Sequence, residues 1–185
     1  VINYLKEKKL AYESEGALVM DVSLPDDTLV VPPLLLVKSN GAISYEMTDL
    51  ATLWERVDNY NPDEIWYVVD KRQDLHFEQV FRAVRKAKIV SEDTKLEYIP
   101  FGTMNGSDGK PFKTRDGGVM RLEDLLNMVT TECEHKIMPS ITGEERTKIA
   151  ETVGIATVKY ADLIPFRGKD YNFDPVKFSD LQGKT

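Results

Sequence analysis

Residues 65–81 read IWYVVDKRQDLHFEQVF, and this stretch decides the fold. Its first five residues form an unbroken apolar run, which is typical of a strand buried on both faces. A polar segment, residues 70–76, follows this run. Apolar residues then recur at the spacing of one helix face, at positions 77, 80, 81 and 84. The stretch therefore predicts a buried strand, a polar loop and a helix, in that order.

The same alternation continues on both sides of this stretch. Residues 42–46 predict a strand, residues 50–57 have helical spacing with Thr48 or Asp49 as the N-cap, and residues 96–101 predict another strand. Residues 42–101 thus predict the order strand–helix–strand–helix–strand. That order is typical of an α/β fold with right-handed crossovers and a parallel sheet. We expect its large aromatic side chains to pack in the core, at Trp54, Trp66 and Phe81.

The N-terminal part has a different pattern. Residues 1–10 predict a short amphipathic helix, and residues 17–22 predict a strand after Gly16. Asn40-Gly41 is the strongest hairpin pattern in the chain, and it predicts antiparallel pairing of residues 34–38 with residues 42–46.

The C-terminal half begins with a cationic loop. Residues 108–126 read DGKPFKTRDGGVMRLEDLL, in which glycines frame Lys110, Lys113 and Arg115. A helix is predicted immediately afterwards, because apolar residues stand at positions 122, 125, 126 and 129. A flexible cationic loop of this kind can close over a polyphosphate and neutralise charge that develops during reaction. The alternative is an ordinary solvated surface loop, since glycine and lysine also mark turns.

The last quarter of the chain predicts further helices. Thr142 and Glu145 have the spacing of a capping box, and Gly154 is the predicted end of that helix. Residues 155–163 predict another helical segment. Residues 165–185 have little periodicity and predict a connector that leaves the domain.

The composition narrows the possible classes of protein. The net charge of −7 argues against a surface that is basic overall, as non-specific nucleic-acid binding would need. No apolar run is long enough to span a bilayer, and we expect no membrane association. Cys133 is the only cysteine, which fits a reducing, cytoplasmic setting. Cys133 and His135 lack a second ligand pair, so we expect no protein-held metal.

Three polar segments follow the predicted strands. They are residues 45–49, residues 70–76 and residues 101–115. Ligands of open parallel sheets bind at the carboxyl ends of the strands, so we expect these segments to converge on one edge.

In this order and spacing, four fragments resemble the later half of the catalytic domain of arginyl-tRNA synthetases, a class I family. The fragments are ISYEMTDLA, IWYVVDKRQDLHFEQVF, FGTMNGSDGKPFKTRDGGVMRLEDLL and VGIATVKYADL. The resemblance implies half of a Rossmann-like nucleotide-binding fold with an N-terminal connective hairpin and C-terminal helices. It divides the chain into a connective insertion (1–41), the second half of the nucleotide fold (42–140) and a helical stem-contact region (141–185). DYNFD at residues 170–174 resembles the family's entry into an anticodon-binding domain.

The resemblance also implies a reaction, in which arginine and ATP form arginyl-adenylate and the arginyl group then moves to tRNA(Arg). Mg²⁺ is implied as the companion of ATP. The family's arginine-binding positions fall on Tyr45, Asp49 and Gln73, and a nucleotide-side histidine falls on His76. The family's phosphate-binding KMSKS loop falls on PFKTR, with Lys113 as the first candidate and Lys110 and Arg115 in support. The backbone of Gly102, Thr103 and Met104 is implied to border adenine.

The chain lacks the HIGH-type motif of class I synthetases. Its two histidines, His76 and His135, do not lie in such a context. We therefore expect a fragment that does not charge tRNA by itself and that self-associates through an open sheet edge. Two alternatives stay open at this point, a free-standing nucleotide-binding paralogue and a non-catalytic interaction module.

Overall fold

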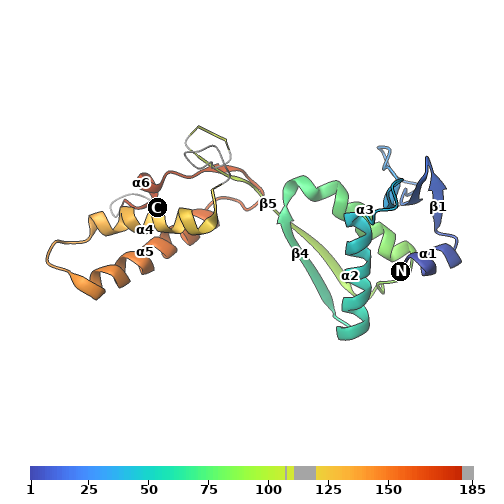
Figure 1. Ribbon diagram of the computed structural model, residues 1–185, viewed down its shortest axis with the longest axis horizontal. Coiled ribbons are helices and arrows are strands. Elements are labelled where there is room, and N and C mark those ends of the chain that lie inside the picture. The colour runs from blue at the N-terminus through green and yellow to red at the C-terminus, as the bar shows by residue number, and fades with distance from the viewer. Residues whose placement is uncertain (107, 111–119, 181–185) are drawn as a thin grey trace. The chain divides into compact units, whose positions relative to one another are not determined.

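The computed structural model describes residues 1–106, 108–110 and 120–180. They form two compact units, Val1–Pro100 and Phe101–Thr185. In Figure 1 the first unit runs from blue to green and the second from yellow-green to red. The functional division at residues 41 and 140 stays a prediction.

The first unit begins with a helix and an antiparallel sheet. Its elements are α1 (Ile2–Glu7), β1 (Ala11–Ser14), β2 (Ala17–Met20) and β3 (Leu34–Val37), and the strand order is β1-β2-β3. Glu15 and Gly16 join the first two strands, and both have positive φ, at 50° and 77°. This pair of angles is the type I′ pattern that matches the twist of a hairpin. The predicted helix and the strand after Gly16 are confirmed, whereas β1 was not predicted.

The Asn40-Gly41 turn is present, but the strand predicted for residues 42–46 is wrong beyond one position. The backbone N–H of Lys38 donates to the carbonyl of Ala42 at 2.8 Å, and Val37 forms a single antiparallel bridge with Ile43. A helix, α2 (Tyr45–Tyr60), starts immediately afterwards.

Ser44 explains why the chain turns into a helix so early. Its hydroxyl accepts a hydrogen bond from the backbone N–H of Met47 at 3.0 Å and donates to the carbonyl of Leu35 at 2.6 Å. Ser44 is therefore the N-cap, and the prediction of Thr48 or Asp49 at that position is wrong. The helix ends at Asn61, which is left-handed with φ 41°.

From α2 onward, the predicted alternation of helix, strand, helix and strand is confirmed. The predicted first strand, residues 42–46, is not formed, and the strand before α2 is β3, which pairs in the antiparallel sheet. After α2 come β4 (Glu64–Asp70), the 3₁₀ turn η1 (Lys71–Gln73), α3 (Asp74–Lys86) and β5 (Lys95–Phe101). Strands β4 and β5 pair in a two-stranded sheet. The unit is thus of the α/β class.

Strand β4 is buried on one face only. Ile65 and Tyr67 are buried against α2 and α3, but Trp66 and Val68 are each 61% exposed. The prediction of burial on both faces, and of Trp66 in the core, is therefore wrong for the described residues. The physical reason is that one helical layer covers one face of this sheet. Phe81 packs against the core, and Trp54 packs edge-on against Tyr4 with ring centroids 4.8 Å apart.

The second unit is built mainly from two long helices that lie side by side (Figure 1). Its elements are β6 (Met104–Asn105), α4 (Leu122–Lys136), α5 (Gly143–Leu163), β7 (Tyr171–Asn172) and α6 (Pro175–Phe178). Strands β6 and β7 pair in parallel. The core joins α4, α5 and the segment before α6 through Leu125, Val129, Cys133, Val158, Ala161 and Phe173.

Two predictions about the helix that begins after Thr142 are wrong. Gly154 does not end a helix, because α5 continues to Leu163, and Thr142 makes no side-chain capping hydrogen bond. Gly154 instead lies at a close approach of α5 to α4. A Cβ atom there would be 2.7 Å from Oγ1 and 3.0 Å from Cα of Thr130.

The C-terminal segment is part of this unit as far as residue 180, so the prediction of a departing connector is wrong for residues 165–180. Phe173 is 1% exposed and stacks on Phe178, with centroids 5.1 Å apart and ring planes at 8°. Asp174 caps α6 by accepting hydrogen bonds from the backbone N–H groups of Val176 and Lys177. Among the described helices, none has the length and apolarity needed to cross a membrane.

Candidate functional site

The first turns of α2 carry the most distinctive polar group in the first unit. Tyr45, Glu46 and Asp49 lie within about 100° of one another around the helix, because each residue turns the helix by about 100°. Tyr45 is 80% exposed, while the side chains of Glu46 and Asp49 are 30% and 29% exposed. Carboxylates in this position are stabilised by the N-terminal end of the helix dipole.

His76, in the first turn of α3, faces both of these carboxylates. Its Nε2 lies 2.7 Å from Oδ2 of Asp49, and its Nδ1 lies 3.8 Å from Oε1 of Glu46. The ring also packs edge-on against Phe77, with centroids 4.8 Å apart. The cluster of Glu46, Asp49 and His76 therefore ties two helices together, and we call it the acid–imidazole cluster.

The electrostatics of the cluster favour a protonated imidazole. The hydrogen bond to Asp49 raises the pKa of His76, the charges of Asp49 and Glu46 raise it further, and desolvation opposes them. Two carboxylates with one imidazolium carry a single net negative charge. A partly buried site with that charge is complementary to one organic cation.

Tyr67 of β4 adds a buried polar group near this cluster. Its side chain is 8% exposed, and its hydroxyl has no hydrogen-bond partner among the described residues. Burial raises the pKa of Tyr67, and the negative charge of Asp49 contributes in the same direction. The guanidinium of Arg56 lies over the Tyr67 ring, 5.4 Å from its centroid, and opposes this shift.

The polar loop after β4 supplies the second predicted segment. Gln73 is exposed and stands one helical turn before His76, at the N-cap of α3. Asp70 accepts two side-chain hydrogen bonds from Arg72, which together with a bond from the Arg72 backbone lower the pKa of Asp70 to about 2. Asp70 is therefore engaged in holding the loop.

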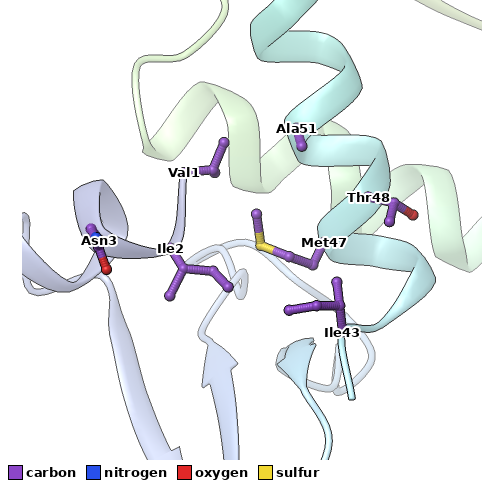
Figure 2. Close-up of a pocket in the computed structure, with 7 residues that line it drawn as sticks. All are labelled: Val1, Ile2, Asn3, Ile43, Met47, Thr48 and Ala51. Carbon is purple, nitrogen blue, oxygen red and sulfur yellow. The ribbon is translucent and has the colours of Figure 1, made fainter. Parts of the chain in front are cut away.

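The apolar pocket in Figure 2 lies on a different face of α2. It has a volume of about 350 Å³ and is lined by Val1, Ile2, Asn3, Ile43, Met47, Thr48 and Ala51. None of these side chains is charged. Met47 and Ala51 point away from the face that carries Asp49, because they lie more than 150° from it around the helix. A cationic substrate has no partner in this pocket.

In the second unit, Gly102 is fixed by a close backbone approach. Its N–H donates to the carbonyl of Arg167 at 2.7 Å, and a Cβ atom would lie 2.1 Å from the carbonyl oxygen of Lys169. The next N–H, of Thr103, donates to Asp170 at 2.7 Å, and Met104 continues into β6. The backbone at Gly102, Thr103 and Met104 is therefore held by the segment that precedes β7.

The cationic loop is described only at its start. The N–H of Gly106 donates to the carbonyl of Lys110 at 2.8 Å, and Gly109 turns the chain with φ 72°. Lys110 is exposed at the end of this tight turn. Lys113 and Arg115 lie outside the described residues.

The structure brings together two of the three predicted segments. Residues 45–49 and 70–76 meet through the bond between Asp49 and His76, within the first unit. The third segment, residues 101–115, belongs to the second unit, and its convergence with the other two stays a prediction.

Comparison with protein-family models shows the family of this chain. Residues 1–175 match the family model described as "tRNA synthetases class I (R), catalytic domain". The chain belongs to this family. It is 48% identical over 187 residues to the arginine–tRNA ligase of Alkaliphilus oremlandii and 49% identical over 193 residues to that of Agathobacter rectalis. In both cases all of this chain is covered, but the chain spans about a third (32%) of the relative.

Solved structures of the class I synthetase family give the same fold. The arginyl-tRNA synthetase of Plasmodium falciparum matches with a TM-score of 0.79 and 26% identity, over 100% of this chain and 30% of that one. The arginyl-tRNA synthetase of Thermus thermophilus matches with a TM-score of 0.76 and 18% identity, over 100% of this chain and 36% of that one. The predicted α/β, class I fold is therefore confirmed.

Sequence reasoning did not single out two residues of this candidate site, Glu46 and Tyr67. Glu46 stands three residues before Asp49, a spacing that places both carboxylates on one helix face, so the pattern was available. Nothing in the sequence marked Tyr67, because it stands within an apolar strand and its hydroxyl becomes notable only through burial.

Proposed function

We propose that this chain is the arginine-binding part of an arginine–tRNA ligase. The observation that carries the proposal is Asp49, a partly buried carboxylate held by His76 on the helix that also presents Tyr45. The near-50% identity to arginine–tRNA ligases supports the choice of arginine as the cation. The reaction would join L-arginine to ATP as arginyl-adenylate, release pyrophosphate, and then transfer the arginyl group to tRNA(Arg) in the cytoplasm.

At the arginine end, the Asp49 carboxylate would accept hydrogen bonds from the guanidinium group. Guanidinium–carboxylate pairs are short, charge-assisted and often bidentate, which makes them selective for arginine over lysine. Tyr45 is exposed on the same helix face and Gln73 is exposed at the start of α3. Both would add hydrogen bonds to the bound amino acid.

At the nucleotide end, the backbone of Gly102, Thr103 and Met104 would border adenine, and Lys113 would stabilise the phosphates with help from Lys110 and Arg115. A lysine placed at developing phosphate charge lowers the barrier electrostatically. Mg²⁺ would arrive with ATP. The described residues contain no group of three acidic, histidine or cysteine side chains that could hold a metal. Magnesium fits this, since it is commonly bound through substrate phosphates and water.

The experiment is tRNA charging by the complete product of the reading frame that encodes this chain. Radiolabelled arginine should appear on tRNA(Arg) with ATP and Mg²⁺, and labelled lysine should not. The Asp49→Ala variant should raise KM for arginine about tenfold or more, as expected for loss of a charge-assisted bond. Failure of the complete product to charge arginine would refute the proposal and favour a paralogue without charging activity.

The 185-residue chain alone serves as a second test. We expect no charging by it, because the family's HIGH-type motif is not among its residues. Charging by the purified chain above the background of a Lys113→Ala variant would contradict this expectation.

A further inference from the structure

We propose that His76 is a positioning residue for arginine, which holds one carboxylate oxygen of Asp49 while the other oxygen faces the guanidinium. The inference rests on the proposed function and assigns His76 to the arginine side of the site. The family resemblance had implied a place for His76 beside the nucleotide.

The geometry of the bond supports this role. Nε2 of His76 contacts Oδ2 of Asp49 at 2.7 Å, and Oδ1 of Asp49 accepts no hydrogen bond from the described residues. A carboxylate oxygen has two lone-pair sites, so a second donor can bind without displacing the imidazole. Fixing the Asp49 rotamer before binding removes an entropy cost that arginine would otherwise have to offset.

The carboxylate of Glu46 stabilises the protonated form of His76. It also adds a negative charge, so a protonated His76 does not neutralise the site. Glu46 lies 3.8 Å from Nδ1 on the opposite edge of the ring. With His76 charged, the acid–imidazole cluster retains one net negative charge, which matches one guanidinium. If Asp49 and His76 stood alone, their charges would cancel, and the attraction for arginine would be weaker.

The packing of the His76 ring also supports a positioning role. His76 is 21% exposed and lies edge-on against Phe77, which is itself buried among Tyr67, Phe81 and Tyr98. An imidazole anchored on an aromatic cluster has little freedom to swing toward another ligand. Its direct partners from α2 are Glu46 and Asp49, so its action on arginine passes through them.

The test uses the complete product of the reading frame, with His76→Ala and His76→Gln. We expect His76→Ala to raise KM for arginine about tenfold or more, with KM for ATP unchanged within about twofold. His76→Gln retains an N–H donor of similar reach and should restore part of the affinity. His135→Gln, the matched control at the chain's other histidine, should leave both constants unchanged.

Several results would overturn the inference while leaving the proposed function intact. These are a rise in KM for ATP alone, a fall in kcat with both KM values unchanged, or no effect of His76→Ala. By contrast, a wild-type product that charges no arginine would overturn the proposed function itself.

A second readout covers the case in which His76→Ala does not fold. In the 185-residue chain with His135→Gln, His76 is the only histidine, so its imidazole ¹⁵N resonances need no assignment. We expect the pKa of His76 to fall when Asp49→Asn is added, because the charge-assisted bond is lost. An unchanged titration in a chain whose α3 amide hydrogens are protected from exchange would overturn the inference, since it would mean that the bond to Asp49 is not formed in the folded chain.

Discussion

Gly154→Ala tests a close approach between the two long helices of the second unit. Glycine in the middle of a helix usually destabilises it by about 1 kcal/mol relative to alanine, so propensity alone predicts a gain of stability. The structure predicts the opposite sign. A Cβ atom at Gly154 would stand 2.7 Å from Oγ1, 3.0 Å from Cα and 3.1 Å from N of Thr130.

The magnitude follows from which of these atoms can move. Optimal carbon–carbon separations are about 3.5–4.0 Å, so the new Cβ would stand too close to the Thr130 backbone by about 0.5 Å or more. The Oγ1 atom can rotate away, but the backbone atoms of Thr130 move only if α4 and α5 separate. Overpacking of this kind costs about 1–3 kcal/mol, which leaves a net loss of up to about 2 kcal/mol after the propensity gain.

The assay is thermal unfolding by far-UV circular dichroism, with amide hydrogen exchange of α5 to locate the effect. A loss of about 1 kcal/mol lowers the midpoint of a domain of 60–100 residues by about 4–8 °C. Both tryptophans, Trp54 and Trp66, lie in the first unit, so their fluorescence reports on that unit. Glu151→Ala, at an exposed position of the same helix, is the matched control and should change little.

Thr130→Ala in the Gly154→Ala background should recover part of the loss, because it removes the clash with Oγ1 and leaves the clash with the backbone. The double-mutant cycle then measures the coupling of the two positions. A raised midpoint for Gly154→Ala alone would refute the reasoning, since it would show that the two helices separate without cost.

Three further predictions concern other parts of the chain. Phe173→Ala should destabilise the second unit by about 3–5 kcal/mol in urea unfolding, because this ring is fully buried; a loss below about 1 kcal/mol would mean that the segment is not part of the core. Asp70→Asn should lower the thermal midpoint at pH 5–6 and have a progressively smaller effect as the pH falls toward about 2. The stabilisation by Arg72 exists above the ordinary pKa of 3.8 and is lost as the pH falls toward about 2. Exposed Trp66 and Val68 should let the isolated chain self-associate, so light scattering should show a mass that rises with concentration and a constant monomer mass for Trp66→Lys.

The sequence by itself determined the class of fold and the order of the main helices and strands from α2 onward. Hydrophobic spacing located α2, β4, α3, β5, α4 and α5, because a buried helix face or strand face must repeat with the period of its backbone. Asp49 and His76 became candidates through the resemblance to the arginyl-tRNA synthetase family, and both lie in the polar segments that were expected to converge. Whether a segment forms a helix or a strand depends mainly on the residues within that segment, so the local pattern predicts it.

Tertiary structure alone decided which of those residues touch one another. The bond between Asp49 and His76 joins residues 27 apart in sequence, and no local pattern distinguishes it from two separate surface groups. Likewise, Gly154 looked like a helix end and proved to be the place where α5 meets Thr130. Trp66 looked like a core residue, yet it lies on the sheet face opposite α2 and α3. Pairing, close approach and one-sided burial depend on the surroundings of a residue, and those are set only when the helices and strands pack.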